Sequence, residues 1–314
     1  MFRVFLLLTV LMTFSCKNNT IEDVKTSVHI DTLQGMSLFD KPLIRRQVDT
    51  IKDVVQISNY NDALVNYIQD SLNTENIIWL GRRIAYLGDY KKAITIFTKG
   101  IDVNPEDAKL LRHRGHRYIS LRQFDLAIKD LESASRLIQG SEDSIEPDGI
   151  PNRLNQPVSS LHTNIWYHLG LAYYLKGEMK NALAAFHECL LASDNDDMIV
   201  ATSHWLYMIL RRMNLPEEAT VILEPISSEM TIIENMAYHK LLLFYKGEFS
   251  EDGLTRNEDG SLGTNEAILY GLGNWNYYNN NVDKAKDIFS DLLKNGNWAG
   301  FGYIAAEADL SALF

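Results

Sequence analysis

The sequence predicts an all-α solenoid, a right-handed superhelix of helix-turn-helix repeats that ends in a C-terminal capping helix. The first observation is a period, because three kinds of residue return after 34 positions, from Gly81 to Gly115, from Tyr90 to Phe124 and from Ala93 to Ala127. The second is helical spacing of apolar residues, which predicts a first helix over residues 60–72. The third is a hydrophobic content of 46%, which is ample for a substantial core.

One segment carries a complete 34-residue signature of two antiparallel helices. Its residues are Trp166, Leu169, Gly170, Tyr173, Ala182 and Phe186, with Gly177 in the turn between the helices. Small residues let the two helices approach closely, and aromatic residues fill the larger gaps beside them. On this motif the chain resembles the tetratricopeptide-repeat (TPR) family, and the resemblance implies a TPR-type α-solenoid.

The repeat signature divides the chain from residue 57 to residue 314. Clear repeats are expected at about 74–107, 108–141 and 163–196, and a degenerate stretch at about 200–250. The signature returns at 266–295, and residues 298–314 are expected to form the capping helix. A cap is required because the terminal repeat of a solenoid otherwise exposes its stacking face to water.

The amino terminus predicts secretion and a lipid anchor. Arg3 precedes an apolar run of about eleven residues, whereas a membrane-spanning helix needs about twenty. The run ends at Ser15 and Cys16 and a polar stretch follows, which resembles a loose bacterial lipobox of the Bacteroidota-like kind. The expectation is a signal peptide over 1–15, acylation of Cys16, a tether over 16–56 and attachment to the outer membrane. An ordinary signal peptide with a chance cysteine is the alternative.

Two details of the tether and the cap concern packing. The apolar island at Leu38 and Phe39 is expected to pack back onto the first helices. Glu307 and Asp309 lie among apolar residues of the capping helix, where they either pair with arginines of the groove or, by the simpler interpretation, belong to a solvated face.

The charge and cysteine content exclude several classes of protein. A net charge of −11 disfavours a general nucleic-acid role, because phosphate binding needs an accumulation of Lys and Arg. With Cys16 acylated, Cys189 is the one remaining thiol, so no internal disulfide is expected and Cys189 is interpreted as an inert core residue. No cofactor and no metal are expected.

The TPR resemblance implies which side chains line the concave groove, since the first helix of each repeat contributes fixed places. These places hold arginine, histidine and tyrosine, namely Arg82, Arg112, His116, Tyr167, Tyr174, His204, Arg211 and Tyr278. Guanidinium groups grip carboxylate, sulfate or phosphate, and tyrosines add contact area. The predicted ligand is an acidic peptide segment or another anionic ligand. The alternative is that some of these arginines pair with Asp or Glu of an adjacent helix.

Two stretches depart from the repeat. The insertion from Gly140 to Ser160 contains three prolines and is interpreted either as a surface excursion or as an element that binds or gates. The stretch from Ser250 to Asn265 is acidic and glycine-containing, and we expect a flexible connector there.

Catalytic and metal-binding motifs are incomplete. His113 and His116 lie three apart on one helix without further predicted ligands, and His187-Glu188 lacks the second histidine of a zinc-protease motif. The sequence therefore predicts a non-catalytic binding or scaffold lipoprotein with an envelope protein as partner. One alternative is an accessory glycan-binding lipoprotein of a polysaccharide-utilisation system, with Trp205, Trp275 and Trp298 as candidate sugar-binding residues unless they belong to the core. Another is an enzyme that uses His113, His116 or His204, and an anionic glycan is also a possible ligand of the groove.

Overall fold

The computed structural model describes residues 32–255 and 265–313. The chain divides into two compact units, Met1–Thr32 and Leu33–Phe314, and the second is described by itself. The predicted signal peptide, Cys16 and the first part of the tether lie outside the described residues.

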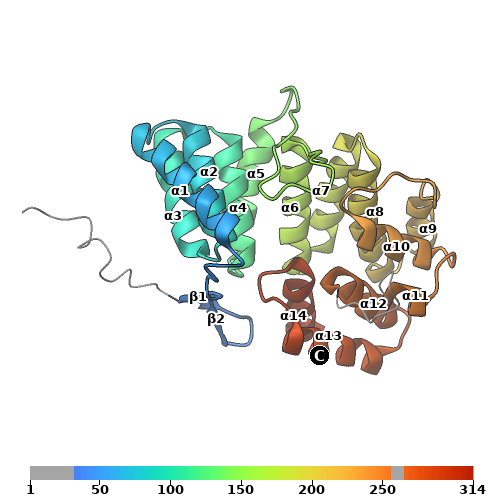
Figure 1. Cartoon of the computed structure of the whole chain (residues 1–314). Helices are drawn as coiled ribbons and strands as arrows, with labels where there is room; N and C mark the ends of the chain where they lie inside the picture. The colour runs from blue at the N-terminus through green and yellow to red at the C-terminus, as the bar shows by residue number, and fades with distance from the viewer. Residues whose placement is uncertain (1–31, 256–264, 314) are drawn as a thin grey trace, which may run out of the picture. The chain divides into compact units, whose positions relative to one another are not determined.

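The second unit is built almost entirely from helices that succeed one another as neighbouring pairs (Figure 1). After α1 (Val54–Gln69), the pairs in chain order are α2 (Thr74–Tyr86) with α3 (Tyr90–Val103), α4 (Ala108–Ser120) with α5 (Phe124–Leu137), α6 (Leu161–Leu175) with α7 (Met179–Ala192), α8 (Asp196–Arg212) with α9 (Pro216–Leu223), α10 (Met236–Tyr245) with α11 (Glu251–Thr255), and α12 (Glu266–Tyr278) with α13 (Val282–Asn295). The last helix is α14 (Phe301–Leu313). The predicted all-helical repeat array is confirmed. Within the described ranges, no helix is both long and apolar enough to cross a membrane.

A residue in the left-handed backbone region marks the turn inside each pair. Glycine occupies it in three turns and asparagine in two, at Gly88, Gly177, Gly247, Asn214 and Asn280. The exception is Arg122, whose φ of 61° places a long side chain where the other turns hold glycine or asparagine. The same kind of turn occurs at Asn214 and Gly247, within α8–α9 and α10–α11. The stretch predicted to be degenerate therefore also consists of helix pairs.

Glycine-to-aromatic contacts hold three of the pairs together. Gly170 on α6 faces Phe186 on α7, and a Cβ added at Gly170 would lie 2.6 Å from that ring. Gly81 faces Phe97 and Gly273 faces Phe289 in the same way. All three phenylalanines are buried. The signature glycines are therefore required because an aromatic ring occupies the space a side chain would take.

A β-hairpin lies within the stretch that the sequence analysis assigned to a tether. β1 (Leu33–Met36) pairs antiparallel with β2 (Pro42–Ile44). Leu38 and Phe39 lie in its turn, 36% and 40% exposed, so they do not form the packed island that we expected. The hairpin segment is held instead by hydrogen bonds to the turn of the first helix pair, because Arg45 donates to the Leu87 carbonyl and to Asp89.

The C-terminal helix α14 joins segments that are far apart in the sequence. Glu307 is 1% exposed and accepts hydrogen bonds from Nε and Nη2 of Arg122, at 2.9 and 2.5 Å. Asp309 is also buried and forms a two-bond pair with Arg212, at 2.7 and 2.5 Å. The interpretation of these carboxylates as a solvated face is wrong, and pairing with arginines is the correct alternative.

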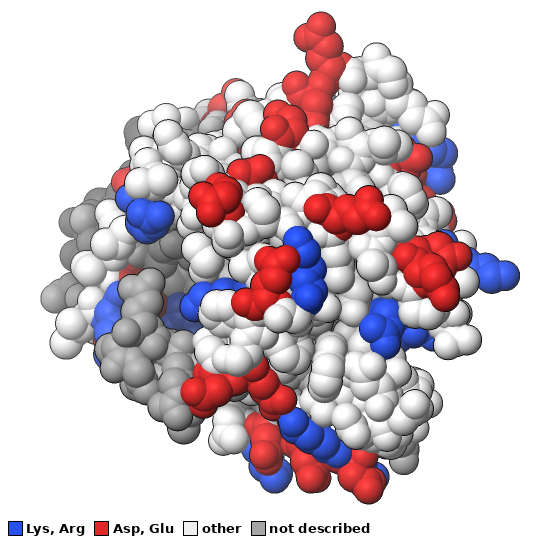
Figure 2. All heavy atoms as spheres, turned by 90° about the vertical axis from the view of Figure 1, so that its right-hand side faces the viewer, with Lys and Arg blue, Asp and Glu red and all other residues white. Residues whose placement is uncertain are grey.

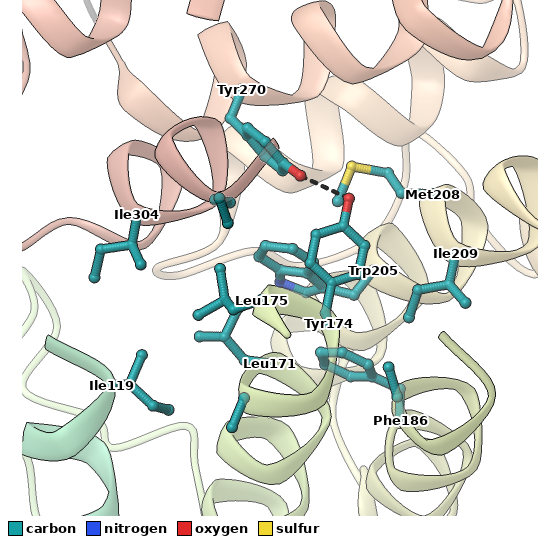
Figure 3. Close-up of a cluster of buried hydrophobic side chains, with 14 of the residues drawn as sticks. Ile119, Leu171, Tyr174, Leu175, Phe186, Trp205, Met208, Ile209, Tyr270 and Ile304 are labelled. Atoms are coloured by element: carbon teal, nitrogen blue, oxygen red, sulfur yellow. Dashed lines mark hydrogen bonds between the residues drawn. The ribbon is translucent and has the colours of Figure 1, made fainter. Parts of the chain in front are cut away.

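The largest buried cluster lies where the C-terminal helices meet the middle of the array. Figure 3 shows Ile304 of α14 and Tyr270 of α12 beside Tyr174, Trp205 and other side chains of α6 and α8. The Tyr174 and Tyr270 hydroxyls are 2.6 Å apart. This core fixes α12 and α14 against α6 and α8. It therefore determines which side chains of the repeat helices remain accessible to solvent.

Replacing Glu307 by alanine is expected to lower the free energy of unfolding by about 3–5 kcal/mol, because Arg122 would remain buried without its partner. Denaturant titration followed by circular dichroism measures the loss. Glu218→Ala on the exposed side of α9 is the control and is expected to stay within about 0.5 kcal/mol of the parent chain. Equal stability of the two variants would show that the contact of α14 with Arg122 does not support the fold.

Gly170→Ala is expected to destabilise the chain by about 1–2 kcal/mol, because overpacking against Phe186 exceeds the gain in helix propensity. Thermal or denaturant unfolding measures the change. Phe186→Leu makes room beside residue 170, so the double variant is expected to lose less stability than the sum of the single losses. Strictly additive losses would contradict a direct contact between the two positions.

Candidate ligand-binding site

A cavity rich in arginine and histidine lies between α2, α4 and α6. Its volume is about 170 Å³, and its lining residues are Arg82, Ala85, Tyr86, Phe97, Arg112, His113, His116, Arg117, Asn164 and His168. We call it the basic cavity. Helical spacing explains the gathering, because Arg112, His113, His116 and Arg117 recur on one side of α4. The structure thus brings together three predicted groove residues, Arg82, Arg112 and His116.

One carboxylate of the Gly140–Ser160 insertion reaches the basic cavity. Glu146 is 7% exposed, and its Oε2 lies 2.9 Å from Nη2 of Arg112. The same oxygen accepts a hydrogen bond of 2.5 Å from Asn164, and Oε1 lies 3.6 Å from Nε2 of His113. The insertion therefore places an internal anion among the cationic and donor groups of the cavity.

The other two arginines of the cavity have no carboxylate within ion-pair distance among the described residues. Arg82 donates to the Pro147 carbonyl and to the Tyr86 hydroxyl. Burial lowers the pKa of Arg117 to about 10, and its guanidinium carbon lies 5.4 Å from the Tyr90 ring centre. Asp148 of the insertion acts electrostatically on Arg82 from outside the lining. Three guanidinium groups thus face two carboxylates, which leaves positive charge in excess.

The histidines supply neutral polar groups. Burial first, and neighbouring arginines second, hold the pKa of His113, His116 and His168 well below the usual value. Nδ1 of His168 bonds the Asn164 carbonyl at 2.6 Å, whereas its buried Nε2 has no partner. The His116 and His168 rings lie 4.3 Å apart, and both contact Phe301 of α14. A neutral imidazole with a free nitrogen can donate to, or accept from, a polar ligand.

Three of the predicted groove tyrosines and histidines lie in the packed interior away from the basic cavity. Tyr174 and His204 are 3% and 0% exposed, which corrects the expectation that they face a ligand. Burial lowers the pKa of His204 to about 3, and its ring stacks on Tyr238. Tyr167 is half-buried and accepts a hydrogen bond from Trp205. These side chains face inward as expected, but α10 and α12 cover them.

The last two predicted groove residues form a separate contact. Arg211 donates to Asn279 and to Tyr207, and its guanidinium carbon lies 4.5 Å from the Tyr278 ring centre. Both Arg211 and Tyr278 therefore belong to the packing of α8 against α12. The basic cavity does not include them.

Among the residues that line or contact the cavity, the predicted groove set lacked Arg117, Glu146 and two histidines, His113 and His168. His113 and His168 have the same place within their repeats, two residues before Gly115 and Gly170 respectively. That shared place is a signal available in the sequence. Glu146 comes from the non-repeating insertion, so no repeat register could assign it.

The three tryptophans considered for glycan binding contact other parts of the chain. Trp205 is buried, Trp275 packs on Phe244, and Trp298 donates to the Ile44 carbonyl. Cys189 is buried, and burial raises the pKa of its thiol to about 12. Over residues 32–255 and 265–313, no group of three or more His, Cys, Asp and Glu could hold a metal ion.

The positive charge of the basic cavity is local. Figure 2 shows the face at the right-hand side of Figure 1, where acidic and basic groups are interspersed among uncharged ones. No broad basic patch is visible among the coloured residues of that face. The excess of arginine in the cavity therefore does not reflect the composition of the chain, which has a net charge of −11.

Comparison with known proteins gives partial relatives. The chain is 24% identical over 199 residues to "BBSome complex member BBS4" of Bos taurus, covering 58% of this chain and 34% of that protein. It is 28% identical over 136 residues to "Small glutamine-rich tetratricopeptide repeat-containing protein 2" of Saccharomyces cerevisiae, covering 42% and 33%. The chain thus spans about a third of the length of each of these curated relatives.

Similar solved structures include "MamA 41-end from Desulfovibrio magneticus RS-1", with a TM-score of 0.42, 16% identity and coverage of 55% of this chain and 84% of that one. Another is "YrrB: a TPR protein with an unusual peptide-binding site", with a TM-score of 0.41, 14% identity and coverage of 78% and 95%.

Family models place the repeats directly on this sequence. Residues 85–107 and 163–196 match one model described as tetratricopeptide repeat, and residues 267–295 match another with the same description. The matches at 163–196 and 267–295 cover helix pairs whose signature glycines face phenylalanines, and the match at 85–107 covers α3, which carries Phe97. Proteins of such repeats are generally non-catalytic and bind protein or peptide partners. The chain therefore contains tetratricopeptide repeats within its all-helical array.

Proposed function

We propose that this chain is a lipid-anchored binding protein of a bacterial cell envelope, which recognises an acidic segment of a protein partner at the basic cavity. The observation that carries the proposal is the excess of guanidinium groups over carboxylates in a protein that is acidic overall. Charge-assisted hydrogen bonds from arginine to carboxylate are about twice as strong as neutral ones, so an acidic side chain is the ligand that fits.

Glu146 supports a carboxylate as the group that enters. Its oxygens already engage Arg112, His113 and Asn164, which are donors suited to a carboxylate. Arg117 and Arg82 have no such ion pair, so an acidic side chain of a partner can add to the network without displacing Glu146. The volume of about 170 Å³ admits a side chain or a peptide end and excludes a folded element.

The anchor and the location rest on the sequence. Arg3, the apolar run after it and the Ser15-Cys16 pair support cleavage before Cys16 and acylation of its thiol. An acylated module would be held at the outer membrane, where its effective concentration for other envelope proteins is high.

The double variant Arg82→Ala and Arg117→Ala is expected to weaken binding of an acidic peptide at least about tenfold, because charged hydrogen bonds contribute about 1.5–3 kcal/mol each. Fluorescence anisotropy with a labelled glutamate-rich peptide measures the affinity, and its glutamine counterpart tests the charge. Arg136→Ala is the control, because this side chain is 63% exposed on α5. Unchanged binding in the double variant, or equal binding of both peptides, would refute the basic cavity as the recognition site.

Cys16→Ala is expected to release the protein from membranes into the soluble fraction, because the acyl chains would have no attachment point. Cell fractionation and immunoblotting measure the distribution. Ser15→Ala keeps a small residue before the cysteine and is expected to leave the protein membrane-bound. Retention of the Cys16→Ala variant in washed membranes would disprove the lipid anchor.

A further inference from the structure

The first helix, α1, is apolar on two opposite faces. Its inner face packs Tyr60, Ala63, Leu64 and Tyr67 against the first helix pair. Its outer face and the turns beside it carry six large apolar side chains, each more than half exposed: Ile51, Val54, Val55, Val65, Ile68 and Leu72. A helix that is apolar on both sides is normally covered on both sides.

The exposed apolar area suits a small, specific contact. Complete burial of a valine, leucine or isoleucine removes roughly 60–120 Å² from water, so these six partly exposed side chains offer roughly 230–470 Å² per copy. Two such faces together bury roughly 460–940 Å² of apolar side chain, and the polar side chains between them add to this area. A second copy of the same helix therefore covers the face with an interface close to the lower bound of about 1,000 Å² for a biological contact.

The order of residues along this face is self-complementary. Val54, Ser58, Asn61, Val65 and Ile68 follow one another on α1 at alternating steps of four and three residues, which keeps them in one stripe. Ile51 lies in the turn that leads into the helix, three residues before Val54. Read in either direction, the stripe runs isoleucine, valine, polar, polar, valine, isoleucine. Two antiparallel copies thus bring isoleucine against isoleucine, valine against valine, and Ser58 against Asn61.

We propose that the chain forms a homodimer in which the α1 helices of two copies pack antiparallel through this stripe. The two-fold axis passes between the two Ser58–Asn61 layers, as an isologous interface requires. The central polar pairs fix the register, because any shift would place Ser58 or Asn61 against an apolar side chain. The inference goes beyond the proposed function and holds whatever ligand the basic cavity takes.

Site-directed disulfides test both the partner and the register. Val54→Cys and Val65→Cys are introduced into separate, differently tagged full-length chains that are co-expressed and oxidised in intact cells. The proposed register places residue 54 of one copy opposite residue 65 of the other, within the reach of a disulfide. Residue 54 lies about 16 Å along the axis from its own counterpart, since eleven residues separate the positions.

The expected result is a disulfide-linked species that carries both tags when the two variants are mixed, and at most a tenth as much when either variant is alone. The chain without an added cysteine gives the background from Cys16 and Cys189. Absence of the mixed species, or equal crosslinking of each variant with itself, would overturn the antiparallel pairing.

The mass of the complex provides a second measurement. Light scattering of the full chain in mild detergent is expected to give twice 35.8 kDa for the protein component. Val65→Asp with Ile68→Asp is expected to halve this mass without loss of helical circular dichroism, because both side chains are exposed in one copy. Leu191→Asp is the matched control, since Leu191 is 78% exposed on α7, and it is expected to remain dimeric. A monomeric parent chain, as when residues 1–31 cover the face, would refute the proposal.

Discussion

The described fold depends on the pairing of two buried carboxylates with two arginines. Glu307 and Asp309 lie on α14, whereas Arg122 lies in the turn between α4 and α5 and Arg212 ends α8. A charge buried this deeply is stable only with a partner, so α14 cannot leave its position without depriving Arg122 and Arg212 of their carboxylates. The ion pairs thereby hold the end of the array against its second and fourth helix pairs.

The basic cavity is a consequence of this arrangement. α14 brings Phe301 against His116 and His168, and the Gly140–Ser160 insertion brings Glu146 against Arg112. The repeat helices alone supply a row of arginines and histidines. The two non-repeating segments restrict access to that row, so a shallow surface becomes a small cavity with defined chemistry. Under the proposed function, the size of the cavity favours recognition of a single side chain over that of an extended peptide along the whole array.

The sequence predicted what depends on local repetition. The 34-residue period identified helix pairs because the glycine of the first helix must face a large apolar side chain of the second, as Gly170 faces Phe186 and Gly115 faces Leu131. The same register predicted one groove for Arg82, Arg112 and His116, and these three side chains line one cavity. The repeat register could not predict Glu146 or the hairpin, because both belong to segments outside the repeats. It also could not predict the burial of Tyr174 and His204, because that depends on how α10 and α12 pack against earlier helices.

Arg122 also has a consequence for how the chain folds. Most solenoids gain stability from neighbouring repeats alone, so they can unravel from either end. Here the contact of Arg122 with Glu307 joins positions 185 residues apart, and closing such a loop costs entropy before it brings any stabilisation. The helices between Arg122 and Glu307 are therefore expected to fold and unfold together. The C-terminal helix α14, which would fray first in an open array, thus shares the cooperativity of the middle of the protein.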